Sequence, residues 1–365
     1  MKRILFVVQL PPPVHGVALM NDLIVKSSHI KEAFETRHVN LGTSAQIADI
    51  GKFSPAKLFL SIRCLALILR QLFAFRPDLV YLTLSPTGFA FYRDAVYISF
   101  IKLFPARLVL HLHGQGIRTG AQNSRLFKWL CRRIFRKSHV IFLSERLKED
   151  AIGFVRPPFF IVNNGLPDDH IIPQHANTHE GPIRILYLSN YVRSKGILDL
   201  IDALEIVARS SSNFHCDLVG KPFDITTDYL LNYIQQKKLA DKITVLGARY
   251  NDEKTRLLEN ADIFILPSCN DAFPLVILEA MKFGLPVIST IEGGIPDIID
   301  DGINGLLVPK KDIAALAGKI IFLLDNPEER TRLGAAGKNK FLHKFTLTTF
   351  EKNIRQVFDG LAGIK

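Results

Sequence analysis

The sequence predicts an α/β protein built from two Rossmann-like domains in succession, and three observations predict it. The chain has 365 residues, enough for two domains that each bury a core. Short apolar segments alternate with helical patterns, which is typical of parallel βαβ units. A polar stretch rich in Pro and Gly, residues 165–182, interrupts that alternation and indicates a linker. We expect an N-terminal domain at 1–170, a linker at 171–182, a C-terminal domain at 183–345 and a last helix at 346–365.

The elements of the first half follow from apolar runs and from residues that bound helices. We interpret residues 3–9 as a first strand and not as a signal peptide, because the apolar run is short and lacks a small-residue cleavage site. The longest helix has Ser54 as a cap, Pro55 in its first turn and Pro77 as its stop. We expect strands at 3–9, 36–41, 78–84, 107–112, 139–143 and 159–163, and helices from residue 16 and at 54–76, 87–104 and 123–137.

The second half repeats the alternation and ends in a helical tail. The apolar run from Asp262 to Leu266 suits a parallel strand that is buried on both faces. A helix then begins near Pro274 and stops at Gly284. We expect strands at 184–188, 215–219, 243–246, 262–266 and 286–290, and helices at 195–208, 228–238, 252–259, 274–282 and 326–360.

The net charge of +11 lies entirely in the first half. Residues 1–170 hold 23 Lys and Arg against 11 Asp and Glu, a net charge of +12, whereas residues 171–365 hold 23 against 24. This asymmetry suggests that the first half meets an anionic surface or substrate. The four cysteines are scattered, which predicts neither a disulfide framework nor a metal site and fits a reducing cytoplasm. No apolar run approaches the roughly 20 residues of a membrane-spanning helix.

Two helices of the first half combine basic and apolar side chains. All charges of the 54–76 helix are basic, and Arg63 and Arg70 share one of its faces. The 123–137 segment is a basic amphipathic helix that carries Trp129, the only tryptophan. Both could be ordinary helices whose long basic side chains reach solvent, or helices that lie against a membrane. For the second, nucleic acid is a further alternative.

The stretch 262–290 offers two carboxylates to one edge of a parallel sheet. Asp271 lies in the loop after a strand, and Glu279 lies one to two turns into the next helix, with four apolar residues before it. Ligands bind at the carboxyl edge of such sheets, and ionised carboxylates accept strong hydrogen bonds from sugar hydroxyls. The alternative is a pair of acids that simply face water.

This stretch resembles the acid-x7-acid signature of retaining glycosyltransferases of family 4, which have the GT-B fold. A second block, residues 292–308, begins Glu-Gly-Gly-Ile-Pro-Asp and is similar to that family's Gly-Gly-x-Pro-Glu run. The likeness covers residues 184–345 closely and the N-terminal half more loosely. The family usually has Glu where this chain has Asp271. The resemblance implies a GT-B fold: two Rossmann-like domains face each other across a cleft, and the last helix crosses back to the first domain.

The resemblance also implies roles in donor binding. Glu279 is similar to the acid that holds the ribose hydroxyls. Asp271, with the backbone around Phe273, Pro274 and Leu275, is similar to the part that holds the donor sugar. Gly220 and Arg249 follow strand ends where the family holds the nucleotide base.

The predicted diphosphate site lies between a strand and a helix, where helix N-termini favour anions. Lys195 matches the family's phosphate lysine, whereas Asn190 stands where the family has Arg, and we expect Arg193 to substitute for it. Lys195 and Arg193 could instead be surface residues of a loop. Gly16, at an earlier strand-to-helix turn, could let the backbone approach a phosphate or be a plain turn glycine.

His113 follows the 107–112 strand at its carboxyl end, where site residues collect. A lone His there is either structural or part of a site. Its His-Gly pair resembles the family's active-site histidine, so His113 and Asp271 are the candidate catalytic residues. We expect His111 on the opposite face, in the core.

The implied function is retaining transfer of a sugar from a nucleotide-diphosphate sugar to a hydroxyl, with a UDP-sugar favoured over a GDP-sugar and no metal or other cofactor. We expect a glycan or lipid-linked acceptor bound by the basic first half, in bacterial polysaccharide or lipopolysaccharide synthesis. The expected location is the cytoplasm, peripheral at the inner face of the cell membrane, with no nucleic-acid partner. The alternatives are a catalytically idle, membrane-associated sugar-nucleotide binder and an epimerase of the same fold.

Overall fold

The computed structural model describes residues 1–42, 55–169, 181–211 and 213–363. Its compact parts are a first unit, Met1–Gly165 with Leu347–Lys365, and a second unit, Leu166–Thr346. The predicted boundary at residue 170 and most of the predicted linker at 171–182 lie outside the described residues, as does the predicted cap Ser54.

The first unit is built on a six-stranded, fully parallel sheet in the order β2-β1-β3-β4-β5-β6. All six residues of its central strand β3 are buried, as expected for a strand covered on both faces. The strands are β1 (Lys2–Val8), β2 (Phe34–Asn40), β3 (Leu79–Leu84), β4 (Arg107–Leu112), β5 (His139–Phe142) and β6 (Phe160–Ile161).

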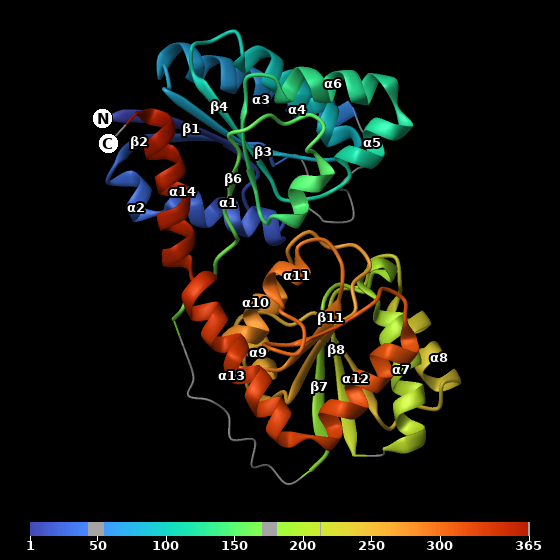
Figure 1. Cartoon of the computed structure of the whole chain (residues 1–365). Helices are drawn as coiled ribbons and strands as arrows, with labels where there is room; N and C mark the ends of the chain where they lie inside the picture. The colour runs from blue at the N-terminus through green and yellow to red at the C-terminus, as the bar shows by residue number, and fades with distance from the viewer. Residues whose placement is uncertain (43–54, 170–180, 212, 364–365) are drawn as a thin grey trace. The chain divides into compact units, whose positions relative to one another are not determined.

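Helices cover both faces of this sheet (Figure 1). The helices α3, α4 and α6 form one layer, and α1, α2 and α14 form the other. The chain's last helix belongs to this unit, since Phe358 of α14 packs edge-on against Phe6 and Tyr81 of the sheet. The helices are α1 (Gly16–Lys26), α2 (Ser28–Lys31), α3 (Pro55–Ala74), α4 (Gly88–Ile101), α5 (Ile117–Asn123), α6 (Arg125–Phe135) and α14 (Leu347–Ala362), with a 3-10 turn at Arg146–Asp150.

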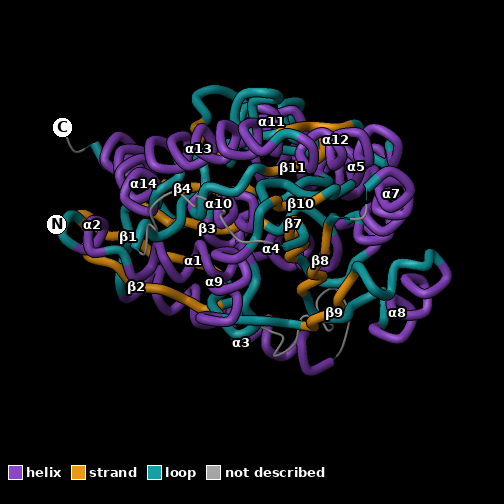
Figure 2. The backbone as a smooth tube through the Cα atoms, turned by 90° about the horizontal axis from the view of Figure 1, so that it is seen from below, coloured by secondary structure: helices purple, strands orange, loops and turns teal. Residues whose placement is uncertain are grey.

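The second unit repeats this plan with the order β12-β11-β10-β7-β8-β9, again fully parallel. Its strands lie between α7 and α12 on one face and α9, α10 and α13 on the other (Figures 1 and 2). The strands are β7 (Ile183–Leu188), β8 (Phe214–Val219), β9 (Ile243–Gly247), β10 (Ile263–Leu266), β11 (Val287–Thr290) and β12 (Leu306–Val308). The helices are α7 (Ile197–Ser210), α8 (Thr227–Gln236), α9 (Asn251–Asn260), α10 (Leu275–Lys282), α11 (Ile295–Ile298), α12 (Ile313–Asp325) and α13 (Pro327–Lys344), with a 3-10 turn at Arg193–Lys195.

Two predicted helices are each divided in the structure. The 123–137 segment begins as α6 only after Ser124, which ends α5 with its N–H on Gly120 and caps α6 by accepting from the N–H of Phe127. The 326–360 tail is α13 and α14, separated at Phe345 and Thr346. The N–H of Leu166 donates to the carbonyl of Phe345 at 2.9 Å, so this break is tied to the start of the second unit.

Candidate functional site

The loop between β7 and α7 brings Lys195 to Asp271. It turns at Gly196, whose φ of +74° suits glycine, and a Cβ there would lie 2.0 Å from the carbonyl oxygen of Pro267. This close contact joins the loop to the one that follows β10. Lys195 Nζ consequently lies 2.5 Å from Asp271 Oδ2 and 3.2 Å from the carbonyl oxygen of Asn270. Two predicted residues that are far apart in sequence thus form one charged pair at the carboxyl edge of the sheet.

Glu279 is held by a residue that the sequence did not indicate. Lys254 Nζ, on α9, lies 2.7 Å from Glu279 Oε1, on α10. The second oxygen, Oε2, is buried and has no hydrogen-bond partner in the described part of the chain. Buried carboxylate oxygens are normally hydrogen-bonded, so an orphaned one calls for a missing donor. A hydroxyl group of a ligand is a donor of the right kind.

The backbone around the start of α10 agrees with its predicted role. Phe273 is buried, with its ring centroid 5.9 Å from that of Phe345. Pro274 precedes the helix, Leu275 begins it, and no side chain caps this end. The first-turn N–H groups of a helix carry partial positive charge and suit an anionic ligand.

Three other predicted residues have local contacts of their own. Asn190 Oδ1 accepts a hydrogen bond from the N–H of Lys221 at 3.3 Å, which fixes the loop after β7. A Cβ on Gly220 would lie 1.9 Å from the carbonyl oxygen of Ser189, so close packing of these loops requires glycine there. The guanidinium of Arg193 lies 5.4 Å from the ring centroid of Tyr229 on α8. Its suggested role at a phosphate stays a prediction.

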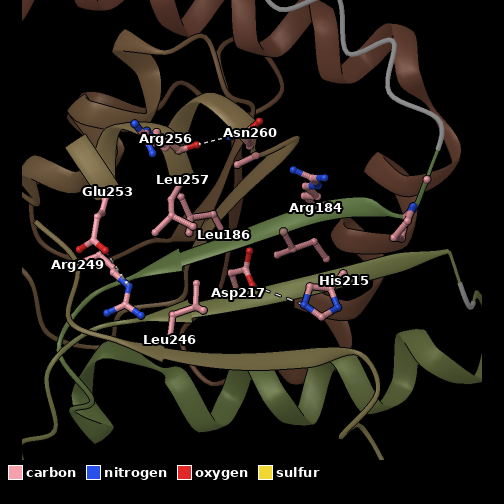
Figure 3. A pocket seen from close by; sticks show the side chains of 14 residues that line it. Arg184, Leu186, His215, Asp217, Leu246, Arg249, Glu253, Arg256, Leu257 and Asn260 are labelled. Carbon is pink, nitrogen blue, oxygen red and sulfur yellow. Dashed lines mark hydrogen bonds and ion pairs between the residues drawn. The ribbon is translucent and has the colours of Figure 1, made fainter. Parts of the chain in front are cut away.

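Arg249 lines a cavity of ≈ 630 Å³ within the second unit (Figure 3). His215 and Asp217 of β8 line its sheet side, and Arg256 of α9 lines its helix side. The lining includes neither Lys195 nor Glu279, so this cavity is separate from the pairs described above. Arg249 itself donates to the carbonyl of Ala248 at 3.3 Å.

In the first unit, His113 belongs to a group of three neighbouring imidazoles. The rings of His111 and His113 are 4.0 Å apart between centroids, so the prediction that His111 lies on the opposite face is wrong, although it is buried as expected. Residues two apart near a strand end share a face. His15 caps α1, which begins at the predicted Gly16, by accepting from the N–H of Ala18. The Nε2 atoms of all three histidines are buried without a partner among the described residues.

Burial keeps these imidazoles neutral. It lowers the pKa of His113 to about 3, with repulsion from His15 adding to the effect. Burial also lowers the pKa of His15 and places that of His111 well below its usual value. His113 is therefore uncharged at neutral pH and a poor proton acceptor, which favours a role in binding over one in proton transfer. In the described ranges, no group of three His, Cys, Asp or Glu side chains is arranged to hold a metal ion.

Comparison with known proteins gives the fold and the kind of chemistry. Residues 168–340 match the family model "Glycosyl transferases group 1". The amylovoran biosynthesis glycosyltransferase AmsK of Erwinia amylovora is 26% identical over 239 residues, which are 63% of this chain and 58% of that protein. The chain thus spans less than two thirds of the length of that relative.

Two solved structures match the whole chain. Sucrose-phosphate synthase from Thermosynechococcus elongatus has a TM-score of 0.80 at 18% identity and covers 100% of both chains. HepE of Anabaena in complex with UDP-glucose has a TM-score of 0.74 at 20% identity and covers 99% of this chain and 100% of its own. The predicted GT-B fold is confirmed, and the family model and the named relatives support glycosyltransferase activity. Membership of family 4 stays a prediction.

Proposed function

We propose that this protein is a retaining glycosyltransferase that moves a sugar from a nucleotide-diphosphate sugar to a hydroxyl of a glycan or lipid-linked acceptor in bacterial cell-surface polysaccharide or lipopolysaccharide synthesis. The observation that carries the proposal is the Lys254–Glu279 pair, which leaves one buried carboxylate oxygen without a donor. A ribose hydroxyl would supply it. The name of AmsK refers to polysaccharide biosynthesis, and the HepE structure is described as a complex with UDP-glucose, which favours a UDP-sugar donor.

In this proposal the second unit holds the donor. Glu279 accepts hydrogen bonds from the ribose, and Lys195 neutralises charge that develops on the leaving diphosphate, together with the N-terminus of α10. Asp271 and His113 position the transferred sugar. The leaving phosphate takes the proton of the acceptor hydroxyl on the same face, so no protein nucleophile is assigned. We infer that transfer needs no metal, because Lys195 and the helix end supply positive charge.

Nucleotide binding tests the donor site. The purified protein is heated with UDP, GDP or ADP, with and without magnesium, and a ligand that binds only the folded state raises Tm. We expect UDP to give the largest shift, with no requirement for magnesium, and Glu279→Ala to abolish it. Asp241→Ala removes an exposed carboxylate of the same unit and is expected to leave the shift unchanged. The absence of a shift with every nucleotide would contradict the proposal.

Turnover separates the two alternatives. An epimerase of this fold would convert the nucleotide sugar without an acceptor, and an idle binder would convert nothing. The proposed enzyme needs the acceptor and retains the anomeric configuration, which proton NMR of the product reads directly.

We further propose that the layer of α3, α4 and α6 faces an anionic membrane. Apolar side chains stand exposed on all three helices: Phe59 and Phe73 on α3 are each 69% exposed, and Trp129 on α6 is 54% exposed. Arg133 lies 5.6 Å from the ring centroid of Trp129, and Arg63 and Arg70 are exposed beside the phenylalanines. Exposed aromatic and basic side chains together suit the interface of a bilayer with anionic lipid. Among the described helices, none is long and apolar enough to cross a membrane.

Vesicle binding tests this layer. We expect co-sedimentation with vesicles containing phosphatidylglycerol and little with pure phosphatidylcholine. Trp129→Ser/Arg132→Gln should weaken binding about tenfold or more, since each basic residue near such a surface contributes about 1 kcal/mol and the tryptophan adds apolar contact. Leu342→Ser/Lys344→Gln makes the same kind of change on exposed positions of α13 and should have no effect. Equal loss in both variants, or binding that ignores lipid charge, would overturn the membrane proposal.

A further inference from the structure

We propose that His15 is a second substrate-binding imidazole of the first unit, whose Nε2–H donates a hydrogen bond to a substrate oxygen beside His113. The inference rests on the proposed glycosyl transfer and adds a residue to it. It stands on two facts about His15, the partner of one ring nitrogen and the lack of a partner for the other.

The tautomer of His15 follows from its place at the start of α1. Its Nδ1 accepts a hydrogen bond from the N–H of Ala18 at 3.3 Å, as the side chain of a helix cap does. An imidazole nitrogen that accepts carries no proton, so the neutral ring carries its proton on Nε2. Nε2–H is consequently a donor in a fixed direction. It is buried and has no acceptor among the described residues.

The position of His15 is held by contacts between α1 and the sheet. Asn21 of α1 donates through Nδ2 to the carbonyl of Gln9 at 3.0 Å, and its Oδ1 accepts from Thr83 of β3 at 2.8 Å. Both partners of Asn21 lie at the carboxyl ends of β1 and β3, the edge where α/β sheets bind ligands. The ring of His15 is thus anchored at that edge by the same contacts that dock α1.

His113 faces the same region with an equally unsatisfied nitrogen. Its ring packs against that of His111, which is fixed in turn by a 2.6 Å hydrogen bond between His111 Nδ1 and the Tyr81 hydroxyl. Mutual repulsion disfavours a proton on either His15 or His113, and burial acts in the same direction. The two rings therefore offer polar groups without net charge. Neutral donors of this kind suit oxygens of sugar hydroxyls and phosphates.

The shared chemistry is an oxygen acceptor, and three sources are distinguishable: the diphosphate, the donor sugar and the acceptor glycan. The decisive variant is His15→Ser. Serine is a good helix cap, so α1 keeps its N-terminal hydrogen bond while the Nε2–H donor is lost. His38→Ser, at an exposed position on β2 of the same unit, is the matched control.

We expect His15→Ser to keep the Tm of the parent within a few degrees and to lower kcat/KM by about tenfold, the effect of one lost hydrogen bond to a neutral group. Calorimetric Kd values for UDP and UDP-glucose, with the KM of the acceptor, identify the source. Equal weakening of both nucleotides points to the diphosphate, weakening of UDP-glucose alone points to the sugar, and a raised KM of the acceptor alone points to the acceptor. His38→Ser should change none of them.

The pH profile adds a readout that a capping role would not move. Protonation of the parent's buried imidazoles at acid pH opposes binding, so part of the acid loss of kcat/KM should disappear in His15→Ser. Unchanged kinetics and affinities in His15→Ser, with normal nucleotide binding by the parent, would overturn this inference alone. A parent protein that binds no nucleotide and transfers no sugar would overturn the proposed function and this inference with it.

Discussion

Replacing Lys195 by Ala is expected to lower kcat by roughly 10²- to 10³-fold, the range seen when a preorganised group that stabilises developing charge is removed. The reason is local. Lys195 Nζ is fixed between Asp271 Oδ2 at 2.5 Å and the carbonyl oxygen of Asn270 at 3.2 Å, so it waits in one place at the carboxyl edge of the sheet. A charge held in place costs no reorganisation when the leaving diphosphate forms. Steady-state kinetics with the nucleotide sugar that binds best measure the effect.

Two further variants show whether Lys195 acts on the donor or only on Asp271. Lys237→Ala also removes a lysine from an ion pair of the second unit, with Nζ 2.7 Å from Asp202 Oδ1, and should leave kcat unchanged. Lys195→Ala/Asp271→Asn removes both charges of the candidate pair. If Lys195 served only to neutralise Asp271, the double variant would recover the activity of Asp271→Asn alone. We expect no recovery, because the donor still lacks its cation.

The fold could be predicted well because its signals are local. Strand β4 lies at Arg107–Leu112 as predicted, since an apolar run between polar residues is enough to mark a buried strand. The division at Ser124 was missed for an equally local reason. Its flanks keep a continuous helical pattern, and whether a serine in such a pattern interrupts it depends on the direction of its side chain.

The site could be predicted only as far as single residues allow. Asp271, Glu279 and Lys195 were found by their place after strands and by resemblance, but their partners were not. Lys254 lies on another helix, 25 residues before Glu279, and no spacing within one element links the two. Such pairs depend on how α9 and α10 pack on one face of the sheet. Gly16 drew attention to the β1–α1 turn, yet the unsatisfied nitrogen belongs to the residue before it.

Removing Lys254 or Glu279 singly is expected to reduce both stability and donor binding, whereas removing both should restore only stability. In Lys254→Met the partly buried carboxylate of Glu279 loses its counter-ion, which should cost about 1–3 kcal/mol of unfolding free energy. Glu279→Gln leaves the Lys254 ammonium without its anion at a similar cost. Lys254→Met/Glu279→Gln replaces the ion pair by neutral groups of similar volume, and its unfolding free energy should return to within about 1 kcal/mol of the parent, since a neutral replacement of an ion pair is often tolerated. Urea denaturation measures this coupling.

Donor binding should follow the carboxylate and not the stability. Hydrogen bonds to a charged group contribute about 1.5–3 kcal/mol, so loss of the Glu279 carboxylate should weaken the nucleotide Kd by roughly 10- to 100-fold in both the single and the double variant. A stable double variant that still fails to bind would separate the two roles of the pair: Lys254 keeps Glu279 ionised and oriented, and Glu279 Oε2 meets the ligand. A double variant that regains both stability and affinity would instead reduce the pair to a link between α9 and α10, and would move the ribose site elsewhere in the second unit.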